Sequence, residues 1–282
     1  MKIKQYIVTY NNNKILHNCL QSIFNNLNDY ELDILDVYVI NNHSNFALEE
    51  KFQLFMEDKK FKDKVNVIHN YGRPDFSTGH LSRSWNQCII HGFVDLNNPS
   101  VDIVATCQND TIFQKNYVTN LIELHKIYDF VNFGHGDNFI SYTPNAIKKV
   151  GLWDERFCNI GHQETDYFIR VARHLYEKST YNDVGKHLPF HINPVNNNII
   201  EIIQSGNERH DINHIKSQEY HNHSLNILLK KWDLNAHPVY LKPTLDDVLN
   251  YNQILNNYFY YPYFEKNIDK NSLLIQKYII ND

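Results

Sequence analysis

Short apolar runs alternate with amphipathic, helix-length segments through the first half of the chain. The runs have the near-continuous hydrophobic character of strands covered on both faces, and they lie at 3–9, 34–40, 65–69 and 101–107. Between them, apolar residues recur at helical spacing, which predicts helices at 15–27, 47–60 and 80–93. Strands that alternate with helices in this way pair in parallel through right-handed crossovers. We therefore expect an α/β fold.

The second half of the chain is less regular. Helical spacing predicts helices at 115–127, 144–150 and 163–176. Short apolar runs predict strands at 130–133, 139–142 and near 180–191. Loops are expected in the Asn-rich stretch 193–198 and the His-rich stretch 206–223, before a helix that ends at Lys230-Lys231-Trp232. Thr244, with Asp247 three residues later, predicts the capped start of a C-terminal helix.

Polar side chains follow three of the predicted strands at the point where each strand ends. The clusters are Thr9–Asn13, Asn41–Asn45 and Gln108–Asp110. In open parallel sheets, ligands bind at the carboxyl ends of the strands. Three polar strand ends side by side would form a cleft, and ligand binding there is the hypothesis that follows.

The third cluster lies in VATCQNDTIF, residues 104–113, where Asp110 follows two amides. Asn and Asp are common in turns because their side chains bond the nearby backbone. A carboxylate at a strand end is also an oxygen ligand of the kind that Mg²⁺ and Mn²⁺ prefer, usually shared with phosphate oxygens of a bound ligand. The local sequence fits a turn and a cation site equally well.

The stretch QETD, residues 163–166, places two carboxylates near a predicted helix start. Glu164 and Asp166 are two positions apart, so they point to different faces of a helix and do not form one clamp. The helix dipole favours acidic residues in a first turn, which explains them without a function. Alternatively, Glu164 projects into the cleft as a general base, while Thr165 or Asp166 caps the helix.

Other residues are candidates through their positions. His191 ends a strand-like run, and His210 and His214 follow it, so each is a candidate for contact with a metal ion or a diphosphate. Arg83 and Asn86 lie near the start of a predicted helix, close to the expected floor of the cleft.

Composition narrows the classes of function. The chain has 282 residues and a formal net charge of −5, without a run of Lys or Arg long enough to follow a phosphate backbone, so we expect no nucleic-acid partner. The four cysteines form no CxxC pair, which favours free thiols over disulfides or structural zinc. No stretch approaches the roughly 20 apolar residues of a transmembrane segment. We therefore expect a soluble, cytoplasmic protein.

Five motifs, the first of them made of three neighbouring stretches, resemble in order the inverting glycosyltransferases of family 2, and in particular their rhamnosyltransferase-like branch. IVTYNN, LHNCLQSIFNN and LDVYVINNHSN are similar to the opening strand, helix and second strand of that family, and LSRSWNQCI is similar to its Trp-Asn-x-Gly-Ile segment. CQNDTIF resembles its metal-binding Asp-x-Asp element in an Asn-Asn-Asp-Thr form. GLWDERFCNIGHQETDYFIR resembles its Gly-x-Phe-Asp-Glu-x-Phe…Glu-Asp-x-Asp…Arg segment, and LLKKWD resembles its Lys-Trp-Gly.

The resemblance implies the GT-A fold, a Rossmann-like, mixed and mainly parallel sheet flanked by helices, as in nucleotide-diphospho-sugar transferases. We accordingly expect a glycosyltransferase domain over 1–235, with a nucleotide-binding half (1–112) and an acceptor-binding half (113–235), and a helical C-terminal extension over 236–282. The implied reaction moves a sugar from a UDP-, dTDP- or GDP-sugar to an acceptor hydroxyl, such as that of a glycan. Inversion and a Mn²⁺ or Mg²⁺ cofactor are also implied.

The resemblance also implies roles for single residues. Asp110 would hold the divalent cation that bridges the diphosphate. His191 is a candidate metal ligand from its position alone. Glu164 stands at the position of the catalytic base, and Asp166 at the acid that follows it. The nucleotide-binding set expected from resemblance and position together is Thr9, Tyr10, Asn41, Asn42, Arg83, Asn86 and Asn109.

Three positions depart from the family pattern. Asn41 replaces the usual Asp, and Gln108 replaces the first acidic or amide residue of the metal element, which leaves Asp110 as its one carboxylate. Gln163-Glu164 replaces Glu-Asp, so the base has a longer side chain or lies one position away.

Two other classes of function stay open. A nucleotidyltransferase has a similar nucleotide-binding half, but it usually carries a Gly-rich phosphate loop near its start, and VTYNNNKIL contains no Gly. A degenerate transferase scaffold that serves as a binding protein would explain Asn41 and Gln108. The presence of both Asp110 and Glu164 favours an enzyme.

Overall fold

The computed structural model describes most of the chain. The described residues are 1–10, 12–42, 50, 53–54, 56–58, 61–70, 81–133, 136–158, 161–176, 200–202, 217–241, 243–259 and 278. The helix expected over 47–60 lies mostly outside these residues, and the strand expected near 180–191 and the loop expected at 193–198 lie wholly outside them.

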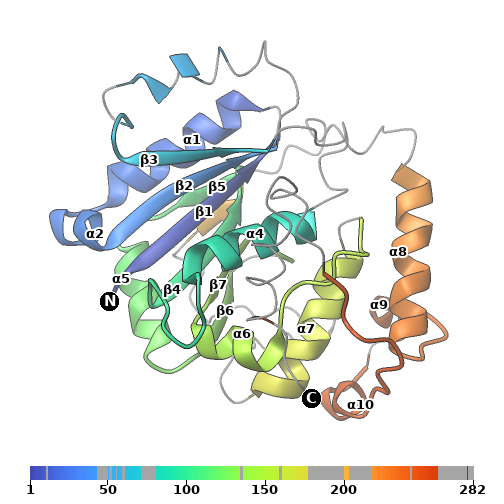
Figure 1. The fold of residues 1–282 in the computed structure, drawn as a ribbon. Helices are drawn as coiled ribbons and strands as arrows, with labels where there is room; N and C mark the ends of the chain where they lie inside the picture. Colours follow the sequence, from blue (N-terminus) through green and yellow to red (C-terminus); the bar gives the residue numbers. More distant parts are fainter. Residues whose placement is uncertain are drawn as a thin grey trace.

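A six-stranded sheet forms the centre of the molecule (Figure 1). Its strands are β1 (Ile3–Thr9), β2 (Leu35–Asn41), β3 (Val65–His69), β4 (Ile103–Gln108), β6 (Phe130–Phe133) and β7 (Phe139–Tyr142). They lie side by side in the order β3-β2-β1-β4-β7-β6. β1 pairs in parallel with β2 and β4, and β2 in parallel with β3, whereas β7 pairs antiparallel with β4 and β6. The sheet is therefore mixed and mainly parallel, which confirms the expected architecture.

Helices cover both faces of this sheet (Figure 1). One face packs against α1 (Asn13–Asn26) and α5 (Tyr117–His125). The other packs against α4 (Leu81–Phe93), α6 (Pro144–Val150) and α7 (His162–Leu175). The helices predicted at 80–93, 115–127, 144–150 and 163–176 are thus confirmed within a few residues.

The alternation of side chains along β4 explains the two cores. Ile103, Ala105 and Cys107 belong to the cluster under α1 and α5, whereas Val104 belongs to the cluster under α4 and α7. Both sets are fully buried, so the run is apolar at nearly every position.

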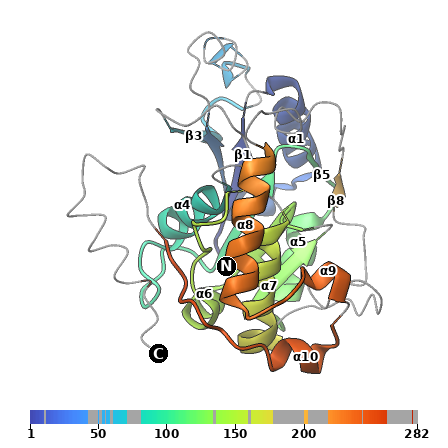
Figure 2. The same ribbon diagram turned by 90° about the vertical axis from the view of Figure 1, so that its right-hand side faces the viewer.

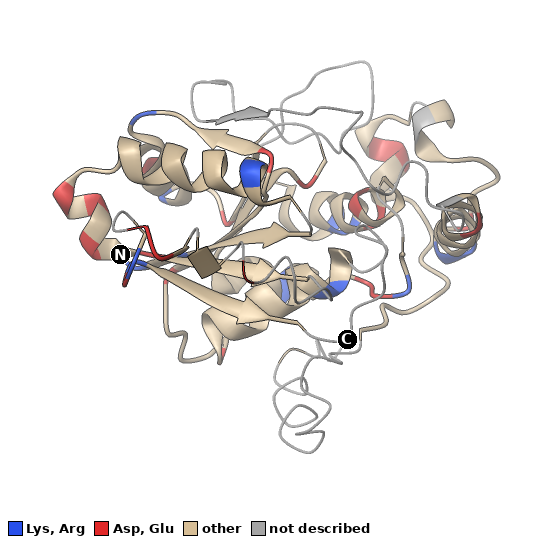
Figure 3. Cartoon of the chain, turned by 90° about the horizontal axis from the view of Figure 1, so that it is seen from above, with Lys and Arg blue, Asp and Glu red and all other residues tan. Residues whose placement is uncertain are grey.

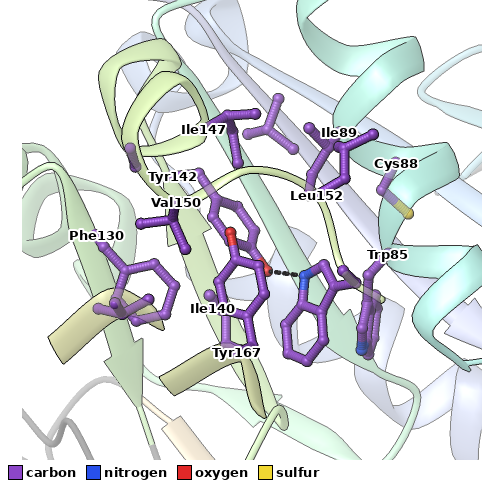
Figure 4. Packing of buried hydrophobic residues seen from close by; sticks show 14 of the residues in the cluster. Trp85, Cys88, Ile89, Phe130, Ile140, Tyr142, Ile147, Val150, Leu152 and Tyr167 are labelled. Atoms are coloured by element: carbon purple, nitrogen blue, oxygen red, sulfur yellow. Dashed lines mark hydrogen bonds between the residues drawn. The ribbon is translucent and has the colours of Figure 1, made fainter. Parts of the chain in front are cut away.

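Aromatic residues fill much of the core between α7 and the sheet. Figure 4 shows Tyr142 and Tyr167 between Phe130 on one side and Trp85 on the other. The phenol of Tyr142 accepts a hydrogen bond of 3.1 Å from Trp153 Nε1, so the polar atoms of these large side chains are paired inside the core.

The structure differs from the expected elements in three places. A short helix, α2 (Asp29–Ile34), precedes β2, because Asn28 and Glu31 form a reciprocal capping box. β5 (Thr111–Phe113) and β8 (Ile200–Ile202) form a separate antiparallel pair that the sequence did not predict. The loop prediction for 206–223 is wrong at its end, where α8 (Ser217–Lys231) has already begun, and 206–216 lie outside the described residues.

The C-terminal residues that the structure describes pack on the same body. They include α9 (Pro238–Leu241) and α10 (Leu245–Leu249), and Thr244 caps α10 as predicted. Figure 2 shows α8 along α7, with α9 and α10 beside them. Val248 and Tyr278 are buried in the core cluster of α4 and α7.

Charged side chains are spread over many elements. In Figure 3, Lys and Arg positions are scattered over the described residues, while α2 is marked by its acidic residues. In the part of the chain that the structure describes, no helix is both long enough and apolar enough to cross a membrane.

Candidate functional site

The three polar strand ends lie next to one another. Thr9 is opposite Asn41 in the β1–β2 ladder, and Val8 is opposite Gln108 in the β1–β4 ladder. Asn109 Nδ2 donates a hydrogen bond of 2.9 Å to Thr9 Oγ1. The predicted grouping of polar residues at the carboxyl ends of the parallel strands is therefore confirmed for the members that the structure describes, while residues 11 and 43–45 lie outside them.

Asp110 lies in the tight turn that joins β4 to β5. β4 ends at Gln108 and β5 begins at Thr111, so Asn109 and Asp110 form the turn, and Asp110 is half-buried. The turn itself lies at the carboxyl end of β4, next to Thr9. The two interpretations of this carboxylate are thus compatible, because a turn residue here is placed at the edge of the sheet where ligands bind.

Tyr10 and Asn41 flank the same edge. Tyr10 follows β1 and is half-buried. Asn41 ends β2 with 4% of its surface exposed, and its Nδ2 lies 3.2 Å from His69 Nδ1 at the end of β3. Tyr10 and Asn41, two members of the predicted nucleotide-binding set, therefore lie beside Thr9.

Asn42 belongs to an internal network of amides. Its Nδ2 donates to Ser84 Oγ at 3.0 Å, and its Oδ1 accepts from Asn70 Nδ2 at 2.7 Å. Asn70 and Gln87 exchange hydrogen bonds of 2.7 and 2.9 Å. These four buried residues tie the ends of β2 and β3 to α4, so the amide of Asn42 supports the edge of the sheet.

Arg83 and Asn86 face the loop that follows α6. Asn86 Nδ2 donates to Trp153 O and to Glu155 Oε1, both at 2.8 Å, and Asn86 Oδ1 accepts from Trp153 N. Arg83 Nε lies 3.4 Å from Glu155 Oε2. Asn86 is fully buried and fixes this loop against α4, while Arg83 is partly exposed.

Asp137 is a buried acid that the sequence did not single out. It lies just before β7 with 1% of its surface exposed. Its Oδ1 accepts from Gln108 Nε2 at 2.6 Å, and its Oδ2 accepts from Trp85 Nε1 at 2.7 Å and Gln163 Nε2 at 3.0 Å. Ser82 Oγ donates to Gln163 Oε1, which turns the NH₂ group of that amide toward Asp137. One carboxylate thus joins β4, α4 and α7.

Glu164 lies in the first turn of α7, against Asp137. The two carboxyl groups are hydrogen-bonded to each other, and Glu164 Oε2 accepts from the backbone N–H of Gly161. Gly136 passes so close that a Cβ there would lie 2.8 Å from Glu164 Oε1, and its φ is +58°. The positive φ favours glycine at 136, and a side chain there would force the Glu164 carboxyl to shift.

The contact between two buried carboxyl groups sets their protonation. Burial, followed by the charge of Asp137, raises the pKa of Glu164 well above its usual range. Burial also raises the pKa of Asp137, and its N–H donors oppose that rise. Since a contacting buried pair does not carry two negative charges, Asp137 holds the charge and Glu164 the proton.

Asp166 faces the opposite side of α7. Its Oδ2 accepts from Nε and Nη2 of Arg170, while its Oδ1 accepts from Trp232 Nε1 at 2.9 Å and lies 2.7 Å from Lys231 Nζ. Lys231 Nζ also pairs with Asp154 Oδ2 at 2.8 Å, and all of these groups are buried. Glu164 and Asp166 do point to different faces, as their spacing predicts.

The oxygen donors at the β4 edge suit a shared cation site. Among the described residues, no group of three or more His, Cys, Asp or Glu side chains is arranged to hold a metal ion. The candidate ligand His191, and with it His210 and His214, lie outside those residues. One carboxylate, Asp110, at the edge where α/β sheets generally bind ligands fits Mg²⁺ or Mn²⁺, which take their other ligands from phosphates and water.

No family model matches the sequence, and neither does any curated protein. Among solved structures, the chain is similar to PcManGT, a mannosyltransferase from Pyrobaculum calidifontis in complex with GDP-Man and Mn²⁺, with a TM-score of 0.53 and 12% identity over 88% of this chain and 72% of that one. It is also similar to S. aureus TarS (residues 1–349), with a TM-score of 0.41 and 14% identity over 60% of this chain and 56% of that one. A third likeness is to GalNAc-T7 with UDP, GalNAc and Mn²⁺, with a TM-score of 0.44 and 11% identity over 61% of this chain and 40% of that one.

The likeness to PcManGT and the topology of the sheet agree on the fold. The chain has the mixed, mainly parallel sheet flanked by helices of GT-A nucleotide-sugar transferases. The fold class expected from the sequence is confirmed.

Proposed function

We propose that this protein transfers a sugar from a nucleoside diphosphate donor to an acceptor hydroxyl, with inversion at the anomeric carbon. One observation carries the proposal. A hydrogen-bonded chain through Gln108 and Asp137 joins the strand end that carries Asp110 to the helix start that carries Glu164. A candidate for diphosphate binding and a candidate base thus lie at the same edge of a GT-A sheet. Support also comes from PcManGT, whose structure contains GDP-Man and Mn²⁺.

The donor would bind along the ends of β1, β2 and β4. Thr9, Tyr10 and Asn41 would contact the nucleoside, because they form the polar edge beside the Asp110 turn. Asn42 and Asn86 would act indirectly, since their amides already bind other parts of the chain.

Asp110 would hold a divalent cation together with the diphosphate. Such a cation supplies positive charge where the leaving diphosphate gains negative charge. Asn109, the neighbouring amide, bonds Thr9 and so fixes the turn that presents Asp110. With one carboxylate, the site would bind the cation weakly until a diphosphate arrives.

Glu164 would act as the general base. In its ionised form it takes the proton of the acceptor hydroxyl as that oxygen attacks the anomeric carbon, and the nucleoside diphosphate leaves with the electrons of the broken bond. Attack from the face opposite the leaving group inverts the configuration. Because Asp166 is held by Arg170, Lys231 and Trp232, we propose that it supports α7 and the loop beneath it.

A panel of nucleoside diphosphates and nucleotide sugars tests this function. Thermal unfolding is followed with each nucleotide, with and without Mn²⁺, and release of nucleoside diphosphate is then measured with the nucleotide sugars that bind. Stabilisation by a nucleotide that depends on the cation, followed by turnover, supports the transferase. Binding without turnover would indicate a binding protein, and turnover of a nucleoside triphosphate with release of pyrophosphate would indicate a nucleotidyltransferase.

A further inference from the structure

The carboxylate of Asp137 is surrounded by side chains that donate hydrogen bonds to it. Three N–H donors from three elements reach its two oxygens, from Trp85, Gln108 and Gln163. None of the ion pairs found within the described ranges involves it. Within the described part of the chain, three N–H groups and no cation hold this carboxylate in place, which leaves its charge unneutralised. That charge therefore acts on the group in contact with it.

The group in contact is Glu164. Its carboxyl interacts with Asp137, and its Oε2 accepts a hydrogen bond from the Gly161 N–H. A Cβ at Gly136 would lie 2.8 Å from Glu164 Oε1, so the backbone next to Asp137 passes close to this carboxyl. The position of Glu164 is thus determined by backbone at two places and by one carboxylate.

We propose that Asp137 is the positioning residue of Glu164. It holds that carboxyl at the edge of the sheet and sets its protonation state before the acceptor binds. The inference rests on the proposed function, in which Glu164 is the base. The negative charge of Asp137 makes Glu164 a stronger base, since a proton on Glu164 interacts favourably with a carboxylate. A base is most effective when its pKa lies near the working pH, which a Glu of ordinary pKa does not achieve.

Two titratable groups near the pair, Tyr142 and His162, stay neutral. Tyr142 of β7 lies near Asp137, and burial raises the pKa of its phenol well above the usual value. His162, at the start of α7, faces His221 and His237, and burial lowers its pKa to about 3. Neither group changes charge between pH 5 and pH 9, so neither contributes a transition in that range.

The test is a titration of the Glu164 carboxyl by ¹³C NMR, with its signal assigned by its loss in Glu164→Gln. In Asp137→Asn, we expect the proton affinity of Glu164 to fall by about tenfold or more, which corresponds to one pKa unit. An Asn with its oxygen toward Trp85 and Gln163 keeps both of those hydrogen bonds, and Gln108 can rotate its amide to accept from the Asn NH₂ group. Asp102→Asn, an exposed carboxylate before β4, is the matched control and leaves the titration unchanged.

A second variant should change the proton affinity of the Asp137–Glu164 pair in the opposite direction. Gln163→Met removes one N–H donor of Asp137 at similar volume, so Asp137 is less stable as an anion and the proton affinity of the pair rises. An unchanged Glu164 titration in a folded Asp137→Asn protein overturns the proposal. If Asp137→Asn does not fold, an unchanged titration in Gln163→Met overturns it.

Turnover separates this inference from the proposed function. With an active donor, the acidic limb of the kcat/KM profile should move to lower pH in Asp137→Asn, in parallel with the NMR titration, while KM for the donor stays the same. A purely structural role for Asp137 would lower the yield of folded protein and leave the pH profile in place, which contradicts the inference. If the titrations come out as expected but no nucleotide sugar is turned over, the coupling of Asp137 to Glu164 is supported and the proposed function is overturned.

Discussion

Glu164 and Asp166 lie two residues apart on α7, and their side chains project from opposite sides of that helix. Glu164 contacts Asp137 at the edge of the sheet, whereas Asp166 is enclosed by Arg170, Lys231 and Trp232 beneath α8. The side chain of Glu164 is half-buried, but its carboxyl group is buried, and burial together with the charge of Asp137 favours its protonated form. The side chain of Asp166 is fully buried and is neutralised by cations. This difference separates a candidate for chemistry from a residue that holds the fold together.

Replacing Glu164 by Gln should stabilise the protein at high pH. Since the pKa of Glu164 is raised in the folded state, its stabilising effect is complete below the usual Glu pKa of about 4.3 and is lost as pH rises through the folded value. Gln resembles the protonated form at every pH. The unfolding temperatures of Glu164→Gln and of the natural protein are compared from pH 5 to pH 9, and the difference should change in favour of the variant as pH rises. The exposed control Glu123→Gln should keep a constant difference. If Glu164→Gln instead became less stable relative to the natural protein as pH rises, Glu164 would not be protonated in the folded state.

Replacing Asp166 by Asn should destabilise the fold strongly. The change leaves Lys231 and Arg170 buried with one negative partner fewer, and loss of one member of a buried ion pair costs about 3–5 kcal/mol. Urea unfolding measures this cost. Below the unfolding transition, the variant should still bind nucleotide. Normal stability combined with lost turnover would instead make Asp166 the base.

Replacing Asp110 by Ala should abolish the cation-dependent part of nucleotide binding. A nucleotide at 100 times its Kd stabilises a protein by about 2.7 kcal/mol, and Mn²⁺ should supply most of that in the natural protein and none in the variant. Calorimetry of nucleoside diphosphate binding with and without Mn²⁺ provides the comparison. Asp102→Ala, at the start of β4, is the control and should behave as the natural protein. An Asp110→Ala protein that keeps its response to Mn²⁺ would place the cation elsewhere.

Replacing Asn42 by Ala should lower stability more than nucleotide affinity. The change removes partners from Asn70 and Ser84 inside the amide network, and a buried polar group without a partner costs about 1–3 kcal/mol. Denaturant unfolding and nucleotide titration of the same sample measure both quantities. A large loss of affinity at unchanged stability would return Asn42 to the group of direct nucleotide contacts.

The sequence predicted the edge of the sheet well, because strand ends follow from local pattern. Apolar runs followed by Thr9, Asn41 and Gln108 were sufficient, since parallel strands bring their carboxyl ends together. The different faces of Glu164 and Asp166 followed from helical geometry alone.

Contacts between distant segments were not predictable in the same way. Asp137 sits in a Gly-containing loop without periodicity, and its role depends on side chains from α4, β4 and α7 that only the fold brings to it. The start of α8 was missed because its first turns are polar and rich in His and Asn, so they show no apolar stripe. The three-residue strands β5 and β8 exist through their pairing across the chain, which no local pattern records.

The central claim, transfer of a sugar with Glu164 as base, is tested most directly by release of nucleoside diphosphate from a panel of nucleotide sugars with Mn²⁺ and an acceptor mixture. We expect at least one donor to be turned over by the natural protein, with a rate at least about 100-fold lower in Glu164→Gln, at unchanged donor binding. Equal turnover by Glu164→Gln, or no binding of any nucleotide by the natural protein, would contradict the account.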